Sequence, residues 1–270
     1  MVGLTRFFNS VFLSVCCLLS TLSLSIQAAT NTSTASVPAI AAASDLRFAL
    51  DEISQKFTHE TGLKVNISYG SSGNFATQIQ NGAPFELFLS ADEKYIQQLH
   101  SAGIARDAGV LYAQGQLAIV VPKAGSLSVD PELKGLAEAL AAGKITRFAI
   151  ANPDHAPYGE KAKEALQFVQ LWDAIQPKLI LGENVSQAGQ FAISGSTQGG
   201  IIALSLAMSP TFSKLSDYAI VPAKMHTPLF QRMALMTKAG ETAQHFYDYL
   251  RANSARRILA DYGFSLPEQP

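Results

Sequence analysis

Four short segments of the chain place small, hydroxyl-bearing or polar residues where an apolar run gives way to a helical pattern. They are Ala43-Ser44-Asp45, Gly70-Ser71-Ser72-Gly73, residues 152–159 and residues 183–186. The start of a helix presents unpaired backbone N–H groups and the positive end of the helix dipole, so such turns can bind an anion. Each segment taken alone is also an ordinary helix cap. The anion-binding interpretation therefore requires that the segments meet in one cleft.

Other kinds of chemistry find little support in the sequence. The glycine-flanked segment at residues 195–199 has Thr197 where a nucleophile elbow needs serine, and no phosphate-binding or dinucleotide-binding glycine motif occurs. The five histidines are scattered without the spacing of metal ligands: His59, His100, His155, His226 and His245. The sequence therefore predicts a binding protein that is not an enzyme and that needs no cofactor.

The first residues have the pattern of a secretory signal. Arg6 precedes an apolar run over residues 7–26, and the small residues Ala28 and Ala29 follow. This order predicts a cleavable signal peptide over residues 1–28 and export to the periplasm. A lipoprotein signal at Cys16 is the alternative, which the bulky Val15 before it disfavours. Both cysteines of the chain lie inside this segment, so the exported protein is expected to contain no disulfide.

The remaining chain reads as an α/β protein. Apolar runs at residues 37–43, 65–69 and 86–90 alternate with amphipathic helical stretches, and the pattern restarts near residue 117. This alternation predicts parallel sheets, and the number of elements suits two lobes with a cleft between them. Later runs predict strands at residues 117–122, 148–151, 179–182, 218–221 and 233–236, and a further apolar run follows Gly199 and Gly200 at residues 201–206. The chain has 20 Lys and Arg against 21 Asp and Glu, without a basic stripe, which argues against nucleic-acid binding.

An ordered set of motifs resembles the periplasmic molybdate-binding protein family over residues 38–265. The most specific match is at residues 79–92, which contain GAPFELFLSAD; the others lie at residues 41–46, 70–73, 152–159, 182–185 and 246–264. The resemblance implies a two-lobed periplasmic-binding-protein fold of type II, with the ligand cleft between the lobes. Lobe 1 would comprise residues 29–115 and 224–270, and lobe 2 residues 116–223.

The resemblance also implies a ligand and a donor set. The family binds a tetrahedral oxyanion, molybdate or tungstate, so that molybdenum is held through the oxygens of its oxyanion. Carried over by position, the donors are the hydroxyl and backbone of Ser44, the backbone N–H of Asp45, Ser72, and the backbone N–H groups of Tyr158 and Val185. We expect no arginine or lysine to contact the ligand, and we expect a site made only of donors to reject protonated anions.

One departure from the family concerns a tyrosine donor. A branch of the family has this tyrosine near the end of the second lobe, where the present sequence reads Gly200-Ile201-Ile202-Ala203. The hydroxyl of Tyr158 is a candidate to replace it.

By this resemblance the protein would be a monomeric solute-binding component that delivers its ligand to the membrane permease of an ABC importer. Alternatives are a binding protein for sulfate, phosphate or an organic acid, an exported enzyme, and a sensor or adhesion module on the same fold. An organic acid would normally require an arginine clamp, and the matched segments contain none.

Overall fold

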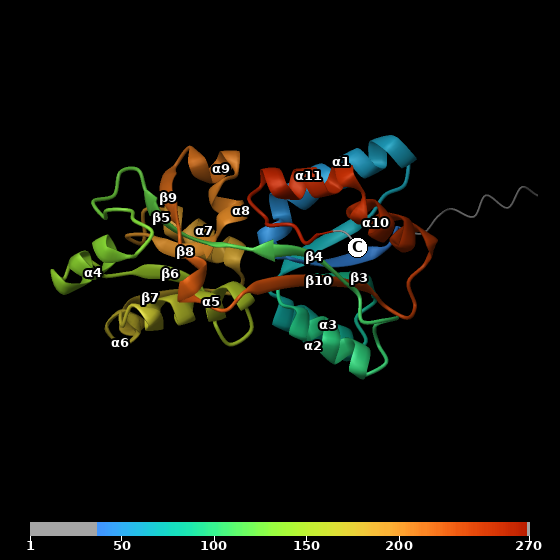
Figure 1. The fold of residues 1–270 in the computed structure, drawn as a ribbon, viewed down its shortest axis with the longest axis horizontal. Helices are drawn as coiled ribbons and strands as arrows, with labels where there is room; N and C mark the ends of the chain where they lie inside the picture. The colour runs from blue at the N-terminus through green and yellow to red at the C-terminus, as the bar shows by residue number, and fades with distance from the viewer. Residues whose placement is uncertain (1–36, 269–270) are drawn as a thin grey trace, which may run out of the picture. The chain divides into compact units, whose positions relative to one another are not determined.

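The computed structural model describes residues 37–268 of the chain. The expected signal peptide at residues 1–28 lies outside these described residues. Two five-stranded sheets organise the described part, as Figure 1 shows. No helix within residues 37–268 is both long and apolar enough to cross a bilayer.

The first sheet has the strand order β2-β1-β3-β10-β4, in which β1 pairs in parallel with β2 and β3, and β10 runs antiparallel to both of its neighbours. Its strands are β1 (Ala39–Ala43), β2 (Asn66–Gly70), β3 (Phe85–Ser90), β4 (Val110–Gly115) and β10 (Leu229–Leu235). The helices connected to it are η1 (Ser44–Leu46), α1 (Arg47–Thr61), α2 (Ser72–Gln80), α3 (Glu93–Ser101), α10 (Glu241–Arg251) and α11 (Asn253–Asp261).

Side-chain alternation along the strands divides the core around this sheet in two. Ile40 and Ala42 pack with α1, α10 and α11, whereas the intervening Ala41 packs with α2 and α3. Successive residues of a strand point to opposite faces, so a continuous apolar run lets β1 be covered on both sides. Figure 1 shows the two groups of helices on opposite faces of the sheet.

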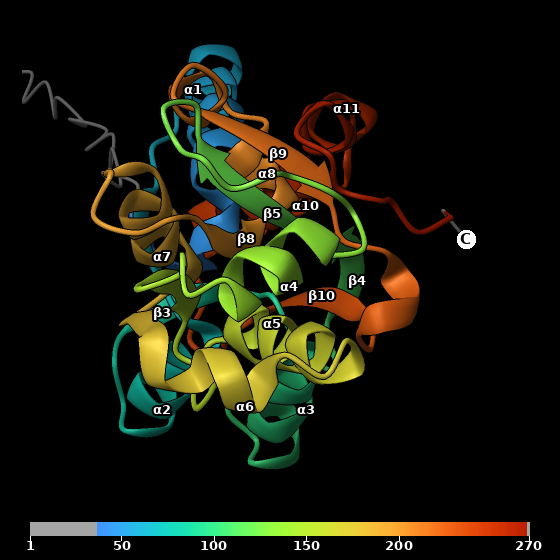
Figure 2. The same ribbon diagram turned by 90° about the vertical axis from the view of Figure 1, so that its left-hand side faces the viewer.

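The second sheet has the order β7-β6-β8-β5-β9. Here β6 pairs in parallel with β7 and β8, and β5 runs antiparallel to β8 and β9. Its strands are β5 (Leu117–Pro122), β6 (Phe148–Ala151), β7 (Leu179–Gly182), β8 (Gly200–Ala203) and β9 (Ser216–Ile220). Its helices, several of which face the viewer in Figure 2, are α4 (Lys134–Ala141), α5 (Pro157–Phe168), α6 (Trp172–Ile175), η2 (Gln176–Lys178), α7 (Val185–Ile193), α8 (Leu204–Ala207) and α9 (Pro210–Ser213).

The structure confirms the predicted strands at residues 117–122, 148–151 and 179–182. It corrects the expectation of parallel sheets: both sheets are mixed, because β5 and β10 each run against their neighbours. The apolar run at residues 201–206 is divided between two elements, since β8 ends at Ala203 and α8 begins at Leu204. An apolar run of this length fits a buried strand and a buried helix equally well, so its pattern alone could not separate the two.

The chain passes between the two sheets twice. The first passage, from β4 to β5, is Gln116, whose carbonyl accepts the Leu204 N–H at 2.8 Å and whose side-chain amide donates to the Gly263 carbonyl at 2.9 Å. The return, from β9 to β10, includes η3 (Ala223–Met225) and Thr227. Thr227 donates its backbone N–H, at 2.6 Å, and its hydroxyl to the carboxylate of Glu164 on α5. Gln116 is thus bonded to segments beside both sheets, whereas Thr227 is bonded to α5.

Candidate functional site

Four helix starts, two beside each sheet, meet at one small pocket. Its empty volume is about 180 Å³, including the part open to solvent. The five residues predicted from the sequence, Ser44, Asp45, Ser72, Tyr158 and Val185, all line it. The complete lining is Ala43, Ser44, Asp45, Gly70, Ser71, Ser72, Ala91, Ala156, Pro157, Tyr158 and Val185. The structure therefore brings the predicted segments together, and this lining contains no lysine or arginine.

The strand ends explain why these helix starts converge. Strands β1, β2 and β3 run parallel and end at Ala43, Gly70 and Ser90, so the loops that follow them emerge at one edge of the first sheet. Strands β6 and β7 do the same in the second sheet and lead into α5 and α7. Ligand sites in open α/β sheets form at the carboxyl ends of strands for this reason.

Backbone N–H groups are the first set of donors at the pocket. Tyr158 follows Pro157, the first residue of α5, and Val185 is the first residue of α7. The N–H groups of a first helical turn have no acceptor within the helix. Cap residues accept other first-turn N–H groups around the pocket. Ser71 accepts the Asn74 N–H at the start of α2, and Asn184 accepts the Gln187 N–H at the start of α7. The N–H groups of Tyr158 and Val185 are thus available to an anion.

Two buried serine hydroxyls form a second set of donors. The Ser44 hydroxyl oxygen accepts the Ser186 N–H at 3.2 Å, and the Ser72 hydroxyl oxygen accepts the Ala91 N–H at 2.9 Å. A hydroxyl that accepts from the backbone keeps its own proton available for donation. Both hydroxyls can therefore donate to a ligand in the pocket.

The side chain of Asp45 was not foreseen in the sequence-derived site, which used only its backbone. The residue is 1% exposed, and its Oδ2 accepts hydrogen bonds from the Gln231 amide at 2.6 Å and the Tyr158 hydroxyl at 2.9 Å. Its Oδ1 has no hydrogen-bond partner among the described residues. Burial raises the pKa of Asp45 to about 6, although the hydrogen bonds from Gln231 and Tyr158 lower it.

Gln231 links this carboxyl group to the first sheet. Its amide nitrogen donates to Asp45 and also lies 3.2 Å from the Tyr158 hydroxyl, while its amide oxygen accepts the Tyr112 hydroxyl at 2.7 Å. A Cβ at Gly115 would overlap the Tyr158 hydroxyl, so glycine at that position makes room for it. The Tyr158 hydroxyl, the candidate substitute for the tyrosine donor of the family branch, donates to Asp45 in this structure.

Direct hydrogen bonds join the two sides of the pocket. The Ser186 hydroxyl on α7 donates to the Ser44 carbonyl at 3.0 Å, and the Ser205 hydroxyl on α8 donates to the Asp45 carbonyl at 2.8 Å. On the other rim, the Gly73 N–H donates to the His155 carbonyl at 3.0 Å. His155 does not line the pocket but lies next to it, with Nδ1 3.0 Å from the Ser71 hydroxyl. These contacts close the pocket from both sides.

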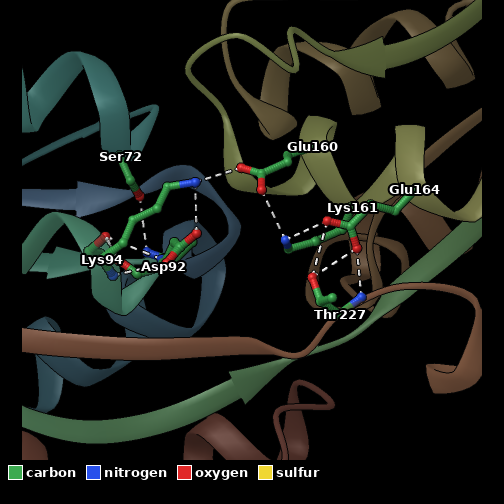
Figure 3. A network of polar contacts seen from close by, with 9 residues as sticks. Ser72, Asp92, Lys94, Glu160, Lys161, Glu164 and Thr227 are labelled. Atoms are coloured by element: carbon green, nitrogen blue, oxygen red, sulfur yellow. Dashed lines mark hydrogen bonds and ion pairs between the residues drawn. The ribbon is translucent and has the colours of Figure 1, made fainter.

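A chain of charged groups extends from the pocket along α5, as Figure 3 shows. Lys94 lies 3.1 Å from the Asp92 carboxylate and 2.6 Å from that of Glu160 across the two sheets. Lys161, only 6% exposed, lies 3.1 Å from Glu160 and 2.7 Å from Glu164. The side chains of Lys94 and Glu160 are only partly buried, so solvent screening limits what this pair contributes to stability. Loss of a partner of the buried Lys161 would be costly, because it leaves a buried charge uncompensated.

Among the described residues, no group of three or more His, Cys, Asp and Glu residues is arranged to hold a metal ion. The geometry of the pocket instead suits a small anion that is bound through N–H and O–H groups.

We predict that Tyr158→Phe lowers the free energy of unfolding by about 1–3 kcal/mol, because it removes a hydrogen bond to the buried Asp45 carboxyl group. Urea denaturation monitored by circular dichroism measures the change. Tyr218→Phe is the matched control, since this tyrosine is exposed on edge strand β9. Equal stability of the Tyr158→Phe and parent proteins would contradict the prediction.

Comparisons with known proteins agree with this geometry. Residues 39–265 match the family model described as bacterial extracellular solute-binding protein. A molybdate-binding protein of Azotobacter vinelandii is 33% identical over 230 residues, which cover 84% of this chain and 89% of the relative. One from Rhodobacter capsulatus is 33% identical over 216 residues, or 79% of this chain and 82% of the relative.

A solved structure supports the fold. The periplasmic molybdate-binding protein of Azotobacter vinelandii superposes with a TM-score of 0.78 at 29% identity, covering 86% of this chain and all of that chain (100%). The expected α/β periplasmic-binding-protein fold is thereby confirmed. With two mixed sheets, a pocket built from helix starts, and a family match that spans nearly all the described residues, the chain belongs to the bacterial extracellular solute-binding proteins.

Proposed function

We propose that this protein binds molybdate or tungstate in the periplasm and delivers it to the permease of an ABC importer. The observation that carries the proposal is the convergence of four helix starts and two buried serine hydroxyls on a pocket lined by no lysine or arginine. The 33% identity to molybdate-binding proteins of two bacteria supports the choice of ligand. The family's extracellular character supports the proposed location.

The proposed donors are the hydroxyls of Ser44 and Ser72 and the backbone N–H groups of Asp45, Tyr158 and Val185. Burying a dianion without compensation would be very costly. Hydrogen bonds to a charged group contribute roughly 1.5–3 kcal/mol each, so five of them offset much of that cost without a cation. Molybdate and tungstate are larger than sulfate, and a rigid cage of their size would hold sulfate loosely.

We propose further that the two sheets belong to two lobes that close over the ligand. Lobe 1 would be residues 29–115 and 224–270, and lobe 2 residues 116–223; the two chain passages, at Gln116 and around Thr227, would act as hinges. Hydrogen bonds such as Gly73 to His155 would then form on closure. The closed form would be the state that the permease recognises, and we propose that the protein works as a monomer.

Calorimetric titration of the purified exported chain with molybdate, tungstate, sulfate and phosphate tests the proposal. We expect one-to-one binding of molybdate and tungstate and much weaker binding of the other two. Tight binding of sulfate or phosphate alone would assign the protein to a different oxyanion. No heat with any of the four would refute the proposed function.

Ser72→Ala should weaken molybdate binding by about 1–3 kcal/mol, because the pocket loses one charge-assisted donor. Calorimetry of the variant measures this loss. Ser194→Ala is the control: this serine is also at a helix end, but it is exposed and distant from the pocket lining. Unchanged affinity in Ser72→Ala would remove this hydroxyl from the donor set.

Gly73→Ala should weaken molybdate binding at least tenfold, mainly by faster dissociation. A Cβ at this position would lie 2.6 Å from the His155 carbonyl oxygen on the opposite side of the pocket, so it would disfavour the closed form. Stopped-flow binding kinetics separate the two rates. Gly240→Ala is the matched control, since its Cβ would meet only the Glu86 side chain, at 3.4 Å. A dissociation rate equal to that of the parent would argue against closure at this contact.

A further inference from the structure

The carboxyl group of Asp45 is unusual in a pocket that otherwise offers donors. Asp45 is one of the residues that line the pocket, so its carboxyl group belongs to a residue that would contact a bound anion. Only Oδ2 has partners, the Gln231 amide and the Tyr158 hydroxyl, whereas Oδ1 is buried with none among the described residues. An ionised carboxylate here would place a further negative charge beside the anion.

The groups around Asp45 offer no evident countercharge. The tyrosines Tyr158 on α5 and Tyr112 on β4 face it, and burial raises the pKa of each well above its ordinary value. Helices α7 and α8, which pack on η1, contain no titratable residue. Arg47, two residues along the chain, lies over the Tyr69 ring, and its buried Nε has no hydrogen-bond partner among the described residues. Arg232, beside Gln231, pairs with Glu93.

We propose that Asp45 is protonated whenever the pocket holds its oxyanion, so that each dianion is bound together with one proton. This inference rests on the proposed function. The proton comes from the solvent and resides on Oδ1, because Oδ2 already accepts two hydrogen bonds. No covalent bond to the ligand forms. Asp45 then acts as a specificity-determining residue, because a neutral acid accommodates a fully deprotonated anion that a carboxylate would repel.

The affinity for the dianion depends on pH because binding is coupled to protonation of Asp45. Before any effect of the anion, burial raises the pKa of Asp45 to about 6 in the closed arrangement, so the group is mostly ionised at neutral pH. A bound dianion raises this pKa further, and binding near neutral pH therefore takes up close to one proton. Affinity rises by up to about tenfold for each unit by which the pH falls toward 6. Below that pH the group is protonated before the ligand arrives, and the dependence levels off.

The protonation state of Asp45 also decides whether the pocket prefers hydrogen phosphate or molybdate. A site made only of donors would reject hydrogen phosphate outright. If Asp45 stayed ionised, its free oxygen could instead accept the proton of hydrogen phosphate, and the site would prefer that ligand over molybdate. A protonated Asp45 restores the preference for the fully deprotonated anion. Ligand choice thus reports the state of this one carboxyl group.

The test is calorimetry of molybdate binding to the exported chain at about pH 7 in buffers that differ in ionisation enthalpy. The slope of the measured heat against that enthalpy gives the number of protons taken up. We expect close to one proton for the parent and none for Asp45→Asn, whose affinity should not change between about pH 6 and about pH 8. His155→Gln is the control, because His155 is the other titratable side chain beside the pocket; its proton uptake should match that of the parent.

Each result of this calorimetry either supports or overturns the proposed protonation of Asp45. Molybdate binding by the parent without proton uptake would overturn the proposal, even if Asp45→Asn fails to fold. Proton uptake that persists in Asp45→Asn, or that is lost in His155→Gln, would assign the proton to another group and also overturn it. Tighter binding of hydrogen phosphate than of molybdate would show that Asp45 remains ionised. Absence of any heat with molybdate would reject the proposed function itself, which the other outcomes leave standing.

Discussion

Hydrogen bonds from the first turns of helices are the interaction on which this structure depends. Each of these turns has backbone N–H groups that its own helix cannot satisfy, and the fold turns four of them toward one pocket. This is possible because parallel strands release their loops at a common edge, and the two sheets present such edges to each other. The two antiparallel strands, β5 and β10, follow the passages of the chain between the sheets and so permit this apposition.

The same pocket contains a group that works against anion binding, the carboxyl of Asp45. The surrounding polar network stabilises it in part: Gln231 donates to it, and Tyr112 in turn donates to Gln231. All three side chains are buried, and a buried polar group without partners costs about 1–3 kcal/mol. The unpartnered Oδ1 is therefore unlike the rest of the network, in which hydrogen bonds are well matched. Protonation of Asp45 removes the conflict of charge when a dianion occupies the pocket.

The sequence predicts much of the pocket because its parts are local. A strand, a small polar turn and a helix start can be recognised within about ten residues, and this placed Ser44, Ser72 and Tyr158 at turns that meet in the structure. Partners far apart in the chain could not be found in this way. Gln231 bonds to Asp45 across 186 positions, and its only local signal is a polar residue within a mostly apolar strand. The direction of β10 and the α8 helix likewise depend on tertiary packing rather than on periodicity.

The contacts that join the two sides of the pocket use residues that also line it. The Ser44 carbonyl accepts the Ser186 hydroxyl, and the Ser44 hydroxyl oxygen accepts the Ser186 backbone N–H. The Ser44 hydroxyl still has its own proton to donate into the pocket. Ser72 and Gly73 are neighbours in α2, one facing the pocket and the other bonding His155 across it. A ligand that orders the inner donors therefore also orders the bridging ones. The partly buried Lys94–Glu160 pair, outside the pocket lining, is screened by solvent and adds less to this coupling. Occupancy and closure are consequently expected to be one event, governed by the neutral hydrogen bonds at the pocket rather than by the ion pairs around it.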